Sequence, residues 1–407
     1  MACFLCGTKT REVSLRIYRV TDRHWQHSRL AEHTVVVEMM IGLIPRGGVS
    51  PRSNPDQKGK TMHAAQPKDF VAKKPIAGIA DDVLDLVGQT PMVRLKRYLD
   101  VADVNLIAKV EALNPGGSAK DRPARYMIES ALADGRLSVG DTVVESSSGN
   151  MGIGLAQACA VHGLKFICVV DPNAQAQNVA IIRALGGQIE LVEQPINGDF
   201  LAARLERVAA LMDVSPGCFW PNQYANLDNP ASHEAGTIAE IDAALPGQID
   251  YLFVACSSTG TARGCRDYLR GMGRKTKVVA VDALGSTLFD GVAGPRKISG
   301  MGAGRIPELA QGQSFDDLVR VADITCVAGC RRSVVREGFL VGGSGGGVLE
   351  AVRGMQHSLR GKTVVAIIHD SGSRYLGTIF DPTWVERELG ATQAEVLNLA
   401  GLGAAVT

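Results

Sequence analysis

The chain has 407 residues, of which 45% are hydrophobic and 21% charged, values typical of an ordinary globular protein. Its 43 basic and 42 acidic residues leave a formal net charge of +1, which gives no support to a role on nucleic acid or on a membrane surface. There is no apolar run of about 18 residues, so we expect no transmembrane helix. The nine cysteines are an odd count that does not suggest a disulfide framework, which favours a reducing cytoplasm.

The first part of the chain differs in composition from the rest. The stretch Pro45–Thr61 has no hydrophobic period and many turn-forming residues. We therefore predict a disordered extension over residues 1–75, or in part a segment upstream of a true start at Met62.

A possible metal site lies within this extension. Its four positions are Cys3, Cys6, His24 and His27. Zinc fingers with two cysteines and two histidines have about twelve residues between the pairs and about three to five between the histidines. The spacings here are different, so we predict no metal site.

From residue 76 onward, short β-branched segments alternate with helical patterns such as Met151–Gly163 and Asn178–Gly186. The segments that predict strands are Val104–Glu111, Asp141–Ser146, Lys165–Asp171, Gln188–Glu193, Tyr251–Cys256, Lys277–Ala283 and Lys362–Asp370. Near-continuous apolar strands that alternate with helices predict an α/β fold with mainly parallel sheets covered on both faces.

This part of the chain is too long for one core, so we predict two doubly wound α/β domains. The smaller is expected over residues 76–225 and the larger over 226–395, followed by a tail at 396–407. The first strand region can cross to the larger domain. Ligands of such sheets bind in a crevice outside the carboxyl ends of the strands. We therefore expect the functional site in turns that follow strands.

Four polar or glycine-rich turns stand out: Glu145–Ala156, Cys256–Gly264, Gly342–Gly347 and His369–Leu376. Backbone N–H groups and hydroxyls in the first two can hold an anion. The turn Glu145–Ala156 could equally be an ordinary helix N-cap formed by serine, and the turn Gly342–Gly347 a flexible loop. The second suits a phosphate, because a helix begins there with its positive end toward the turn. It matches neither a Walker loop nor a dinucleotide-binding fingerprint.

A lysine, Lys120, lies in the turn "NPGGSAKDRPARYMI" (Asn114–Ile128). A phosphate-binding turn without a nucleotide motif, together with this lysine, suggests pyridoxal 5′-phosphate. The aldehyde of this cofactor forms a Schiff base with a lysine, and its ring takes up electrons. We expect Asp121 and Arg122 to position the turn rather than to take part in the chemistry. Arg125 lies one helical turn beyond Asp121 and is expected to pair with it.

Taken together, the motifs resemble a known family. The stretches "VGQTPMVRL", "NPGGSAKDRPARYMI", "SSGNMGIGLA", "NQYANLDNP", "STGTARG" and "GGSGGG" follow the order and spacing of the fold-type-II pyridoxal-phosphate enzymes, the family of cysteine synthases and cystathionine β-synthases. The resemblance covers roughly residues 82–389. It implies a tryptophan synthase β-like architecture with the cofactor in the cleft between two domains. It also implies replacement of a group at the β-carbon of an amino-acid substrate.

The resemblance assigns roles to the residues at matching positions. Lys120 would be the catalytic residue, which holds the cofactor and then carries the substrate's α-proton. Asn150 would bind the cofactor's ring hydroxyl, and Ser344 its pyridine nitrogen. The cofactor phosphate would be bound by Ser257, Ser258, Thr259, Gly260 and Thr261. The substrate carboxylate would be bound by Ser147, Ser148, Gly149 and Asn150.

Several positions depart from ordinary cysteine synthases. Tyr224 replaces a phenylalanine, Ser257 a glycine, Met151 a threonine and Arg305 an aromatic residue. Two added hydroxyls and a cation suit a phosphorylated donor and an anionic acceptor, so Tyr224 and Arg305 are predicted to bind substrate. Together with "DPTWVERELG" (Asp381–Gly390), these changes resemble the diaminopropionate-pathway branch of the family.

That branch joins O-phospho-L-serine to L-glutamate, giving N-(2-amino-2-carboxyethyl)-L-glutamate and phosphate. This is the first step toward L-2,3-diaminopropionate for siderophores or peptide antibiotics. Two alternatives stay open: a cysteine synthase that uses O-phosphoserine or O-acetylserine with sulfide, and a non-catalytic paralogue that binds a partner or senses an amino acid. Retention of Lys120, Asn150 and Ser344 argues against the paralogue. Since the family is usually homodimeric, we expect a cytoplasmic homodimer that acts on small molecules, without nucleic-acid or membrane partners.

The extension generates a first prediction. Because the resemblance begins after residue 75, deletion of residues 1–61 should leave cofactor binding and steady-state kinetics unchanged. Cofactor absorbance and initial rates of the truncated and full-length proteins would test this. Misfolding of the truncated protein, or loss of its activity, would show that the extension packs on the rest of the chain.

Overall fold

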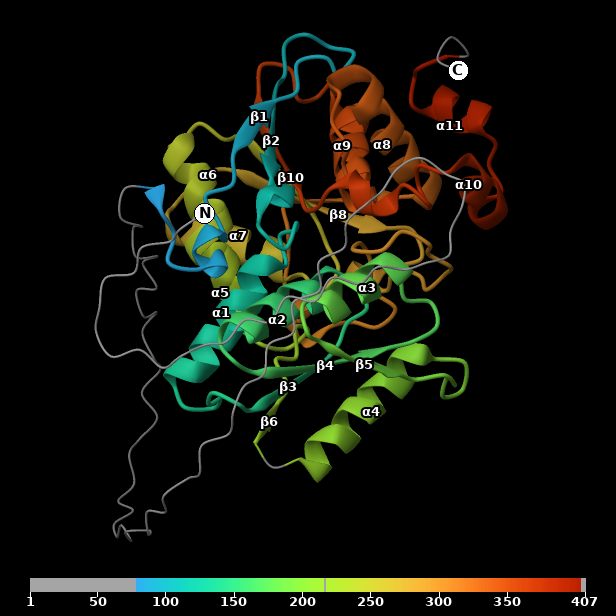
Figure 1. The fold of residues 1–407 in the computed structure, drawn as a ribbon. Coiled ribbons are helices and arrows are strands. Elements are labelled where there is room, and N and C mark those ends of the chain that lie inside the picture. Colours follow the sequence, from blue (N-terminus) through green and yellow to red (C-terminus); the bar gives the residue numbers. More distant parts are fainter. Residues whose placement is uncertain (1–77, 216, 404–407) are drawn as a thin grey trace, which may run out of the picture. The chain divides into compact units, whose positions relative to one another are not determined.

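The computed structural model describes residues 78–215 and 217–403, which form two β-sheets with helices on both faces (Figure 1). The expected extension, Met62 and the four extension cysteines and histidines lie outside the described residues. The strands are β1 (Met92–Arg94), β2 (Asn105–Val110), β3 (Thr142–Ser146), β4 (Lys165–Val170), β5 (Gln188–Leu191), β6 (Cys218–Phe219), β7 (Tyr251–Ala255), β8 (Lys277–Ala283), β9 (Asp317–Val321) and β10 (Thr363–Ile368).

The helices begin and end as follows: α1 (Asp121–Ala133), α2 (Asn150–Val161), α3 (Ala176–Ala184), α4 (Phe200–Val214), α5 (Asp228–Ser232), α6 (Ala239–Ala244), α7 (Gly260–Gly271), α8 (Asp323–Glu337), α9 (Gly343–Met355), α10 (Pro382–Leu389) and α11 (Gln393–Leu399). A π-helical segment, His233–Ile238, makes α5 and α6 continuous.

The larger sheet has six strands in the order β1-β2-β10-β7-β8-β9, and the smaller has four in the order β5-β4-β3-β6. All neighbouring strands are parallel except β1 and β2. The first two strands thus belong to the larger sheet, and the chain leaves it to build the smaller sheet before it returns at β7. The α/β fold with two mainly parallel sheets is confirmed.

Side chains of the larger sheet alternate between two cores. Ala108, Phe253 and Val279 pack with α8 and α9 on one face, while Leu252 and Ala280 pack with α7 on the other. In the smaller sheet, α1, α2 and α3 cover one face and α4 the other (Figure 1). Because the strands are buried on both faces, they appear in the sequence as continuous apolar runs, which is why seven of them could be predicted.

Three strands were not predicted. β1 and β6 are too short to show a period, and β9 (Asp317–Val321) is an edge strand whose residues are mostly half-buried, so it keeps two charged side chains. At the other end, Val396 in α11 and the following Ala400 are buried in the core that covers one face of the larger sheet, while the domain bounds expected from the sequence stay a prediction.

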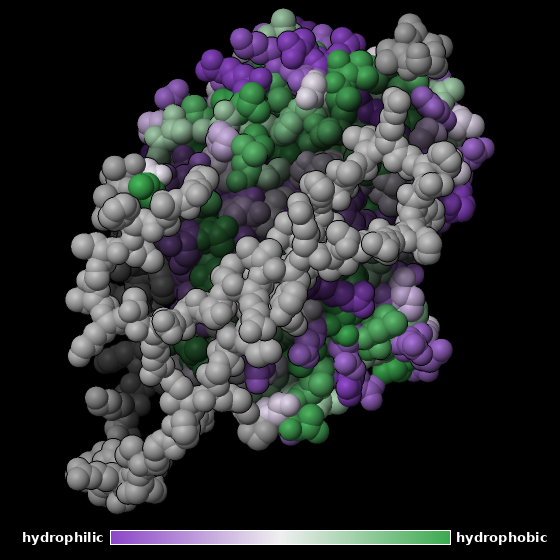
Figure 2. All heavy atoms as spheres, viewed as in Figure 1, coloured by the Kyte–Doolittle hydropathy of each residue, from purple (hydrophilic) through white to green (hydrophobic). Residues whose placement is uncertain are grey.

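Within the described part of the chain, no helix is both long and apolar enough to span a bilayer. Where described residues are visible in Figure 2, polar and apolar side chains are interspersed over the surface. The seven cysteines in this part carry free thiols; they are Cys159, Cys168, Cys218, Cys256, Cys265, Cys326 and Cys330. Nowhere in residues 78–215 and 217–403 is a group of three or more histidine, cysteine, aspartate or glutamate side chains placed to hold a metal ion.

Candidate active site

Lys120 lies directly before α1, at the end of the turn that follows β2. The Ala119 N–H donates to the carbonyl of His369 at 2.8 Å, which ties the turn to the end of β10. Burial lowers the pKa of Lys120 to about 8, although the charges of Asp370 and Cys256 oppose the shift. A larger share of the amine is therefore neutral near pH 7 than for an ordinary lysine, which favours attack on an aldehyde and acceptance of a proton.

Asp121 closes the glycine turn before Lys120. Its carboxylate accepts from the Gly116 N–H and, at 3.3 Å, from the Ser118 hydroxyl. Burial raises the pKa of this carboxyl to about 7. The expectation that Asp121 positions the turn agrees with these contacts. Arg125 does not pair with Asp121; it reaches Glu129 at 2.8 Å and Asp85 at 3.2 Å instead.

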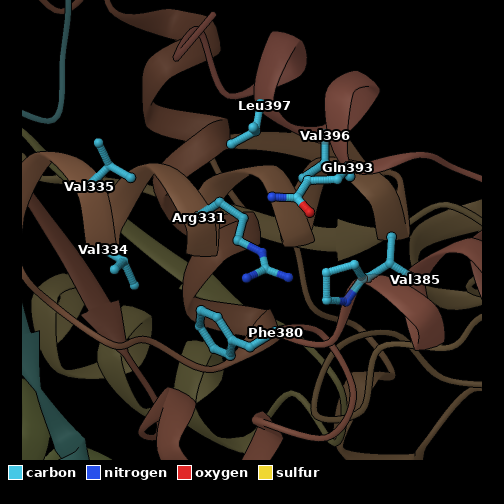
Figure 3. A pocket seen from close by; sticks show the side chains of 9 residues that line it. Arg331, Val334, Val335, Phe380, Val385, Gln393, Val396 and Leu397 are labelled. Atoms are coloured by element: carbon cyan, nitrogen blue, oxygen red, sulfur yellow. The ribbon is translucent and has the colours of Figure 1, made fainter. Parts of the chain in front are cut away.

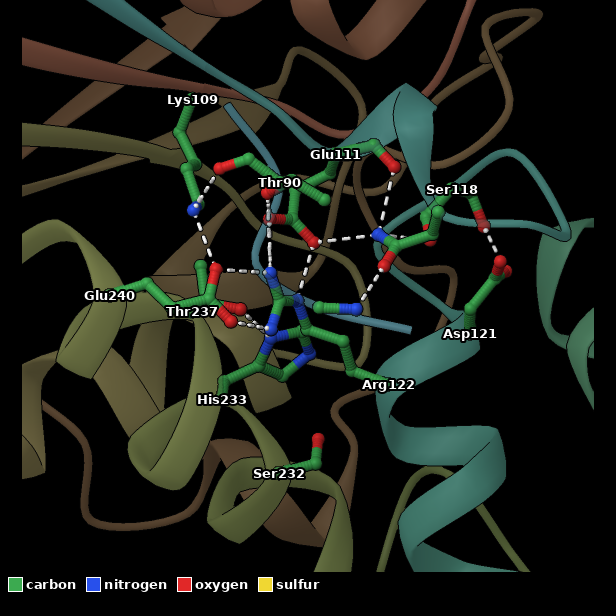
Figure 4. A network of polar contacts seen from close by, with 12 residues as sticks. Thr90, Lys109, Glu111, Ser118, Asp121, Arg122, Ser232, His233, Thr237 and Glu240 are labelled. Carbon is green, nitrogen blue, oxygen red and sulfur yellow. Dashed lines mark hydrogen bonds and ion pairs between the residues drawn. The ribbon is translucent and has the colours of Figure 1, made fainter. Parts of the chain in front are cut away.

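Arg122 is the centre of a buried ionic network (Figure 4). Its Nε and Nη2 donate to the Glu111 carboxylate at 2.7 and 2.9 Å. Its Nη1 and Nη2 donate to Glu240 at 2.6 and 2.8 Å. Lys109 Nζ also donates to Glu240, at 2.6 Å, so two cations face two anions. The network links the end of β2 to α1 and α6.

Each carboxylate in this network has a cationic partner. Glu111 is fully buried, and burial alone would raise its pKa. The charge and hydrogen bonds of Arg122 outweigh that effect and hold the pKa of Glu111 below its usual value. Because bidentate pairs fix both distance and direction, the network sets the position of the first turn of α1, directly after Lys120.

A second prediction concerns this network. Arg122→Met should lower the free energy of unfolding by about 3–5 kcal/mol, because it leaves the fully buried Glu111 carboxylate without a cationic partner. Urea unfolding followed by circular dichroism measures the loss. Adding Glu111→Gln to the Arg122 variant should recover part of it. The control is Arg183→Met on an exposed position of α3, which should change little. Equal effects of the two methionine variants would contradict the structural role of the network.

The expected cofactor-ring residue, Asn150, is the first residue of α2 and meets the loop after β10. Its Nδ2 donates to Asp370 at 2.8 Å, and its Oδ1 accepts from Arg374. Arg374 also donates to the Gly116 carbonyl, and the Tyr375 hydroxyl donates to Asp370 at 2.5 Å. The loop after the last strand therefore joins the Lys120 turn and α2, a role that our sequence analysis did not assign to it.

Asp370 is buried, and its Oδ1 has no hydrogen-bond partner in the described chain. Burial raises the pKa of Asp370, although its bonds to Tyr375 and Asn150 oppose the shift. The start of α9 approaches it so closely that a methyl group at Gly342 would lie 1.9 Å from Oδ1. Only glycine fits there. Ser344, two residues later, is also buried, and its hydroxyl has no hydrogen bond within the described chain.

The expected phosphate loop runs from Ser257 into α7. Thr259 adopts a left-handed conformation (φ 66°), and no side chain caps the helix, so the first N–H groups of α7 are available to an anion. A methyl group at Gly260 would lie 2.1 Å from Asn229 Oδ1, so the loop packs tightly on α5. Asn229 also donates to the Ser258 hydroxyl at 3.3 Å.

A buried histidine supports the same loop. His233 Nε2 lies 3.1 Å from Thr261 Oγ1, and its Nδ1 lies 2.9 Å from Thr237 Oγ1. Burial lowers the pKa of His233 well below its usual value, so the ring is neutral and one nitrogen donates while the other accepts. The sequence offered no sign of this role, because a lone histidine in a helical pattern carries no signal of a partner 28 residues away.

The expected carboxylate-binding segment lies between β3 and α2. Gly149 is the N-cap of α2 and makes no side-chain cap. The Ser147 hydroxyl accepts from the Gly152 N–H at 3.1 Å, so this serine takes part in capping as the simpler interpretation held. The Ser148 carbonyl accepts from Asn178 at 3.3 Å.

Tyr224 is half-buried beside several charged side chains. Burial and the nearby carboxyl of Glu145 raise the pKa of its hydroxyl, while Arg204 and Arg296 act in the opposite direction. Glu145 accepts from the Gln223 N–H at 3.2 Å, which fixes the Tyr224 turn to the end of β3. The two arginines are cations near Tyr224 that our sequence analysis missed.

Arg204 and Arg296 differ in their partners. Arg204 Nε lies 3.1 Å from an Asp171 carboxylate oxygen. Arg296 Nε is buried and has no hydrogen-bond partner in the described chain. Arg305, the cation that we had placed at the substrate, is exposed and makes no ion pair with Glu308 or any other described residue.

The sequence of this site can be compared with known proteins. Residues 83–370 match the family model described as "Pyridoxal-phosphate dependent enzyme". The chain belongs to this family. Two relatives named N-(2-amino-2-carboxyethyl)-L-glutamate synthase share 42% identity over 311 residues (Ralstonia nicotianae) and 40% over 329 residues (Cupriavidus metallidurans). The matches cover 76% and 80% of this chain, and 92% and 96% of the relatives.

Solved structures agree with the family. O-ureido-L-serine synthase superposes with a TM-score of 0.69 at 33% identity, covering 74% of this chain and 96% of its own. The O-acetylserine-dependent cystathionine β-synthase of Helicobacter pylori gives 0.68 at 29%, covering 74% and 98%. The resemblance to the fold-type-II pyridoxal-phosphate enzymes is confirmed, and with it the enzyme class and the cofactor.

The described residues fit pyridoxal phosphate. Lys120 supplies an amine that burial makes partly neutral, and the uncapped start of α7 supplies N–H groups for a phosphate. Ser344 supplies a hydroxyl that no described residue occupies. Asn150 is the exception, since its amide is bonded to Asp370 and Arg374. A ring hydroxyl bound there would share Asn150 with these two residues.

Lys120 gives a third prediction. In protein stripped of cofactor, the pH midpoint for acetylation of Lys120 by acetic anhydride should lie near 8. Asp370→Asn should move the midpoint lower, because it removes a negative charge that favours the protonated amine. Peptide mass spectrometry measures the labelled fraction at each pH. A midpoint at the ordinary lysine value of about 10.4 would contradict the desolvated environment.

Proposed function

We propose that this enzyme joins O-phospho-L-serine to L-glutamate and releases phosphate, giving N-(2-amino-2-carboxyethyl)-L-glutamate. The observation that carries the proposal is the 42% and 40% identity to two synthases of that name over most of this chain and of theirs. The polar setting of Tyr224 supports it, since a cleft with nearby guanidinium groups suits anionic substrates better than sulfide.

Pyridoxal phosphate, when bound, takes up electrons from bonds at the substrate's α-carbon. Lys120 first anchors this group and then, as a neutral amine, accepts the α-proton and returns it at the end of the cycle. A pKa of about 8 suits both duties, because a general base works best when its pKa is near the working pH. The N–H groups at the start of α7 hold the cofactor's phosphate, with Ser257, Ser258, Thr259 and Thr261.

The same residues orient the substrate. The start of α2, with Ser147, Ser148 and Gly149, binds the α-carboxylate and so directs the α-proton toward Lys120. Tyr224 and the cations around it receive the anionic groups: the leaving phosphate and the carboxylates of the acceptor. Arg305 is exposed and has no ion-pair partner in the described chain, so its guanidinium is available to an anionic substrate.

The test is release of inorganic phosphate from O-phosphoserine in the presence of glutamate. We expect turnover with the wild type. Lys120→Ala should lose at least the roughly 10²–10⁴-fold that a general acid–base group contributes. Retention of more than about a tenth of the activity, on the order of 1.4 kcal/mol in barrier, would refute the role of Lys120. Turnover with sulfide but not with glutamate would favour a cysteine synthase.

A fourth prediction concerns substrate choice. Arg305→Phe, Tyr224→Phe and Arg296→Gln should each lower the specificity constant for O-phosphoserine and glutamate roughly ten- to a hundredfold, the worth of one charge-assisted hydrogen bond. Reaction of O-acetylserine with sulfide should hold or rise, because these neutral or small substrates do not need the removed groups. Initial rates on both substrate pairs provide the measurement.

Two outcomes would contradict this assignment. Equal loss on both substrate pairs would mean that a variant damages the site in general. No loss on either pair would mean that the residue does not contact substrate. The exposed Arg183→Met variant again serves as a control for unrelated loss of a positive charge.

We also propose that the enzyme is a homodimer, for which sedimentation analysis is the test.

A further inference from the structure

A pocket whose lining contains none of the proposed active-site residues lies between α8, α10 and α11 (Figure 3). Its volume is about 170 Å³. The lining residues are Arg331, Val334, Val335, Phe380, Pro382, Val385, Gln393, Val396 and Leu397. An engineered apolar cavity of about 150 Å³ takes up benzene, so this pocket has room for a ring or a short alkyl chain.

The walls are apolar and differ in exposure. Val385, Val396 and Leu397 are buried and form a fixed floor, since all three also belong to packed elements. Val334 and Val335 are 36% and 43% exposed and form a rim. Two adjacent exposed valines on a helix leave apolar surface in contact with water, which a bound apolar group would cover.

Two polar groups enter this apolar space. In Figure 3 the guanidinium of Arg331 lies in the middle of the pocket, between the Phe380 ring and the Gln393 carboxamide. Its Cζ is 5.2 Å from the ring centroid. Neither Arg331 nor Gln393 makes a hydrogen bond or ion pair within the described chain. The nearby charge of Asp381 acts on Arg331, but that carboxylate caps α10 through the Thr383 N–H at 3.0 Å.

We propose that this pocket binds a small carboxylic acid with a compact apolar body, such as an aromatic or short-chain acid. The carboxylate would receive the planar donors of Arg331 and the amide N–H of Gln393, while the apolar part would lie on Val385, Val396 and Leu397. Among the described residues that line the pocket none is acidic, so nothing would hold the ammonium group of an amino acid. The site is therefore distinct in chemistry from the amino-acid site proposed at Lys120.

Benzoate and benzamide are matched probes, because they have nearly the same shape and differ in charge. Calorimetric titration of the holoenzyme should show benzoate binding, with benzamide roughly ten- to a hundredfold weaker, as expected for loss of a charge-assisted hydrogen bond. Arg331→Gln should weaken the binding of benzoate to the level of benzamide binding. Val335→Trp, which places a bulky group at the rim, should weaken the binding of both probes. The control, Arg336→Gln, removes an exposed arginine from the same helix and should leave both unchanged.

Three binding results would overturn the proposal: no benzoate binding to the wild type, equal binding of the two probes, or unchanged benzoate binding by Arg331→Gln. The last would place the probe elsewhere, for example at the proposed α-carboxylate site. A change of sedimentation mass in Arg331→Gln would show instead that the pocket is covered by a second copy of the chain, and would also refute a ligand site. None of these measurements depends on turnover, so failure of the pocket proposal would leave the proposed function untouched.

Discussion

The paired contacts of Arg122 with Glu111 and Glu240 are the constraint on which the arrangement of this site depends. These residues come from α1, from the segment after β2 and from α6; Arg122 and Glu111 are buried and Glu240 is half-buried, so water shields their charges only weakly. A buried ionic network is not a strong source of net stability, because desolvation offsets most of the attraction. Its value lies in geometry: bidentate contacts admit few alternative positions for the start of α1. Lys120, one residue before that helix, is positioned as a consequence.

Asp370 provides a second contact that holds separate parts of the site together. The carboxylate at the end of β10 accepts from Asn150 of α2, which packs on the smaller sheet, and from Tyr375 of its own loop, and the backbone of Gly342 lies close against it. The same residue acts on the charge of Lys120. One buried carboxylate thus couples the position of α2, the start of α9 and the proton affinity of the amine. Parallel sheets commonly bind ligands at the carboxyl ends of their strands, and Asp370 shows how this chain organises that edge.

The sequence predicted the local features of this molecule well and its long-range contacts poorly. Strands such as β7 and β10 were evident because burial on both faces makes them continuous apolar runs. Lys120 and the turn before α7 were evident because glycine, hydroxyl residues and a helix start lie next to one another. Arg122 and Glu240 are 118 residues apart, and Asn150 and Asp370 are 220 apart. No periodicity connects such pairs. The turn that contains Asp370 and Arg374 was therefore evident in the sequence but its partners were not, and His233 and Arg296 entered the site only through the folded structure.

The account is tested most directly by competition between the two acceptors. O-phosphoserine is incubated with the enzyme, ¹⁵N-labelled glutamate and sulfide at equal concentrations, and the products are separated by mass spectrometry. The account predicts that N-(2-amino-2-carboxyethyl)-L-glutamate dominates, that it carries the ¹⁵N label, and that phosphate appears in equal amount. Cysteine as the main product, or phosphate release without the labelled adduct, would contradict it.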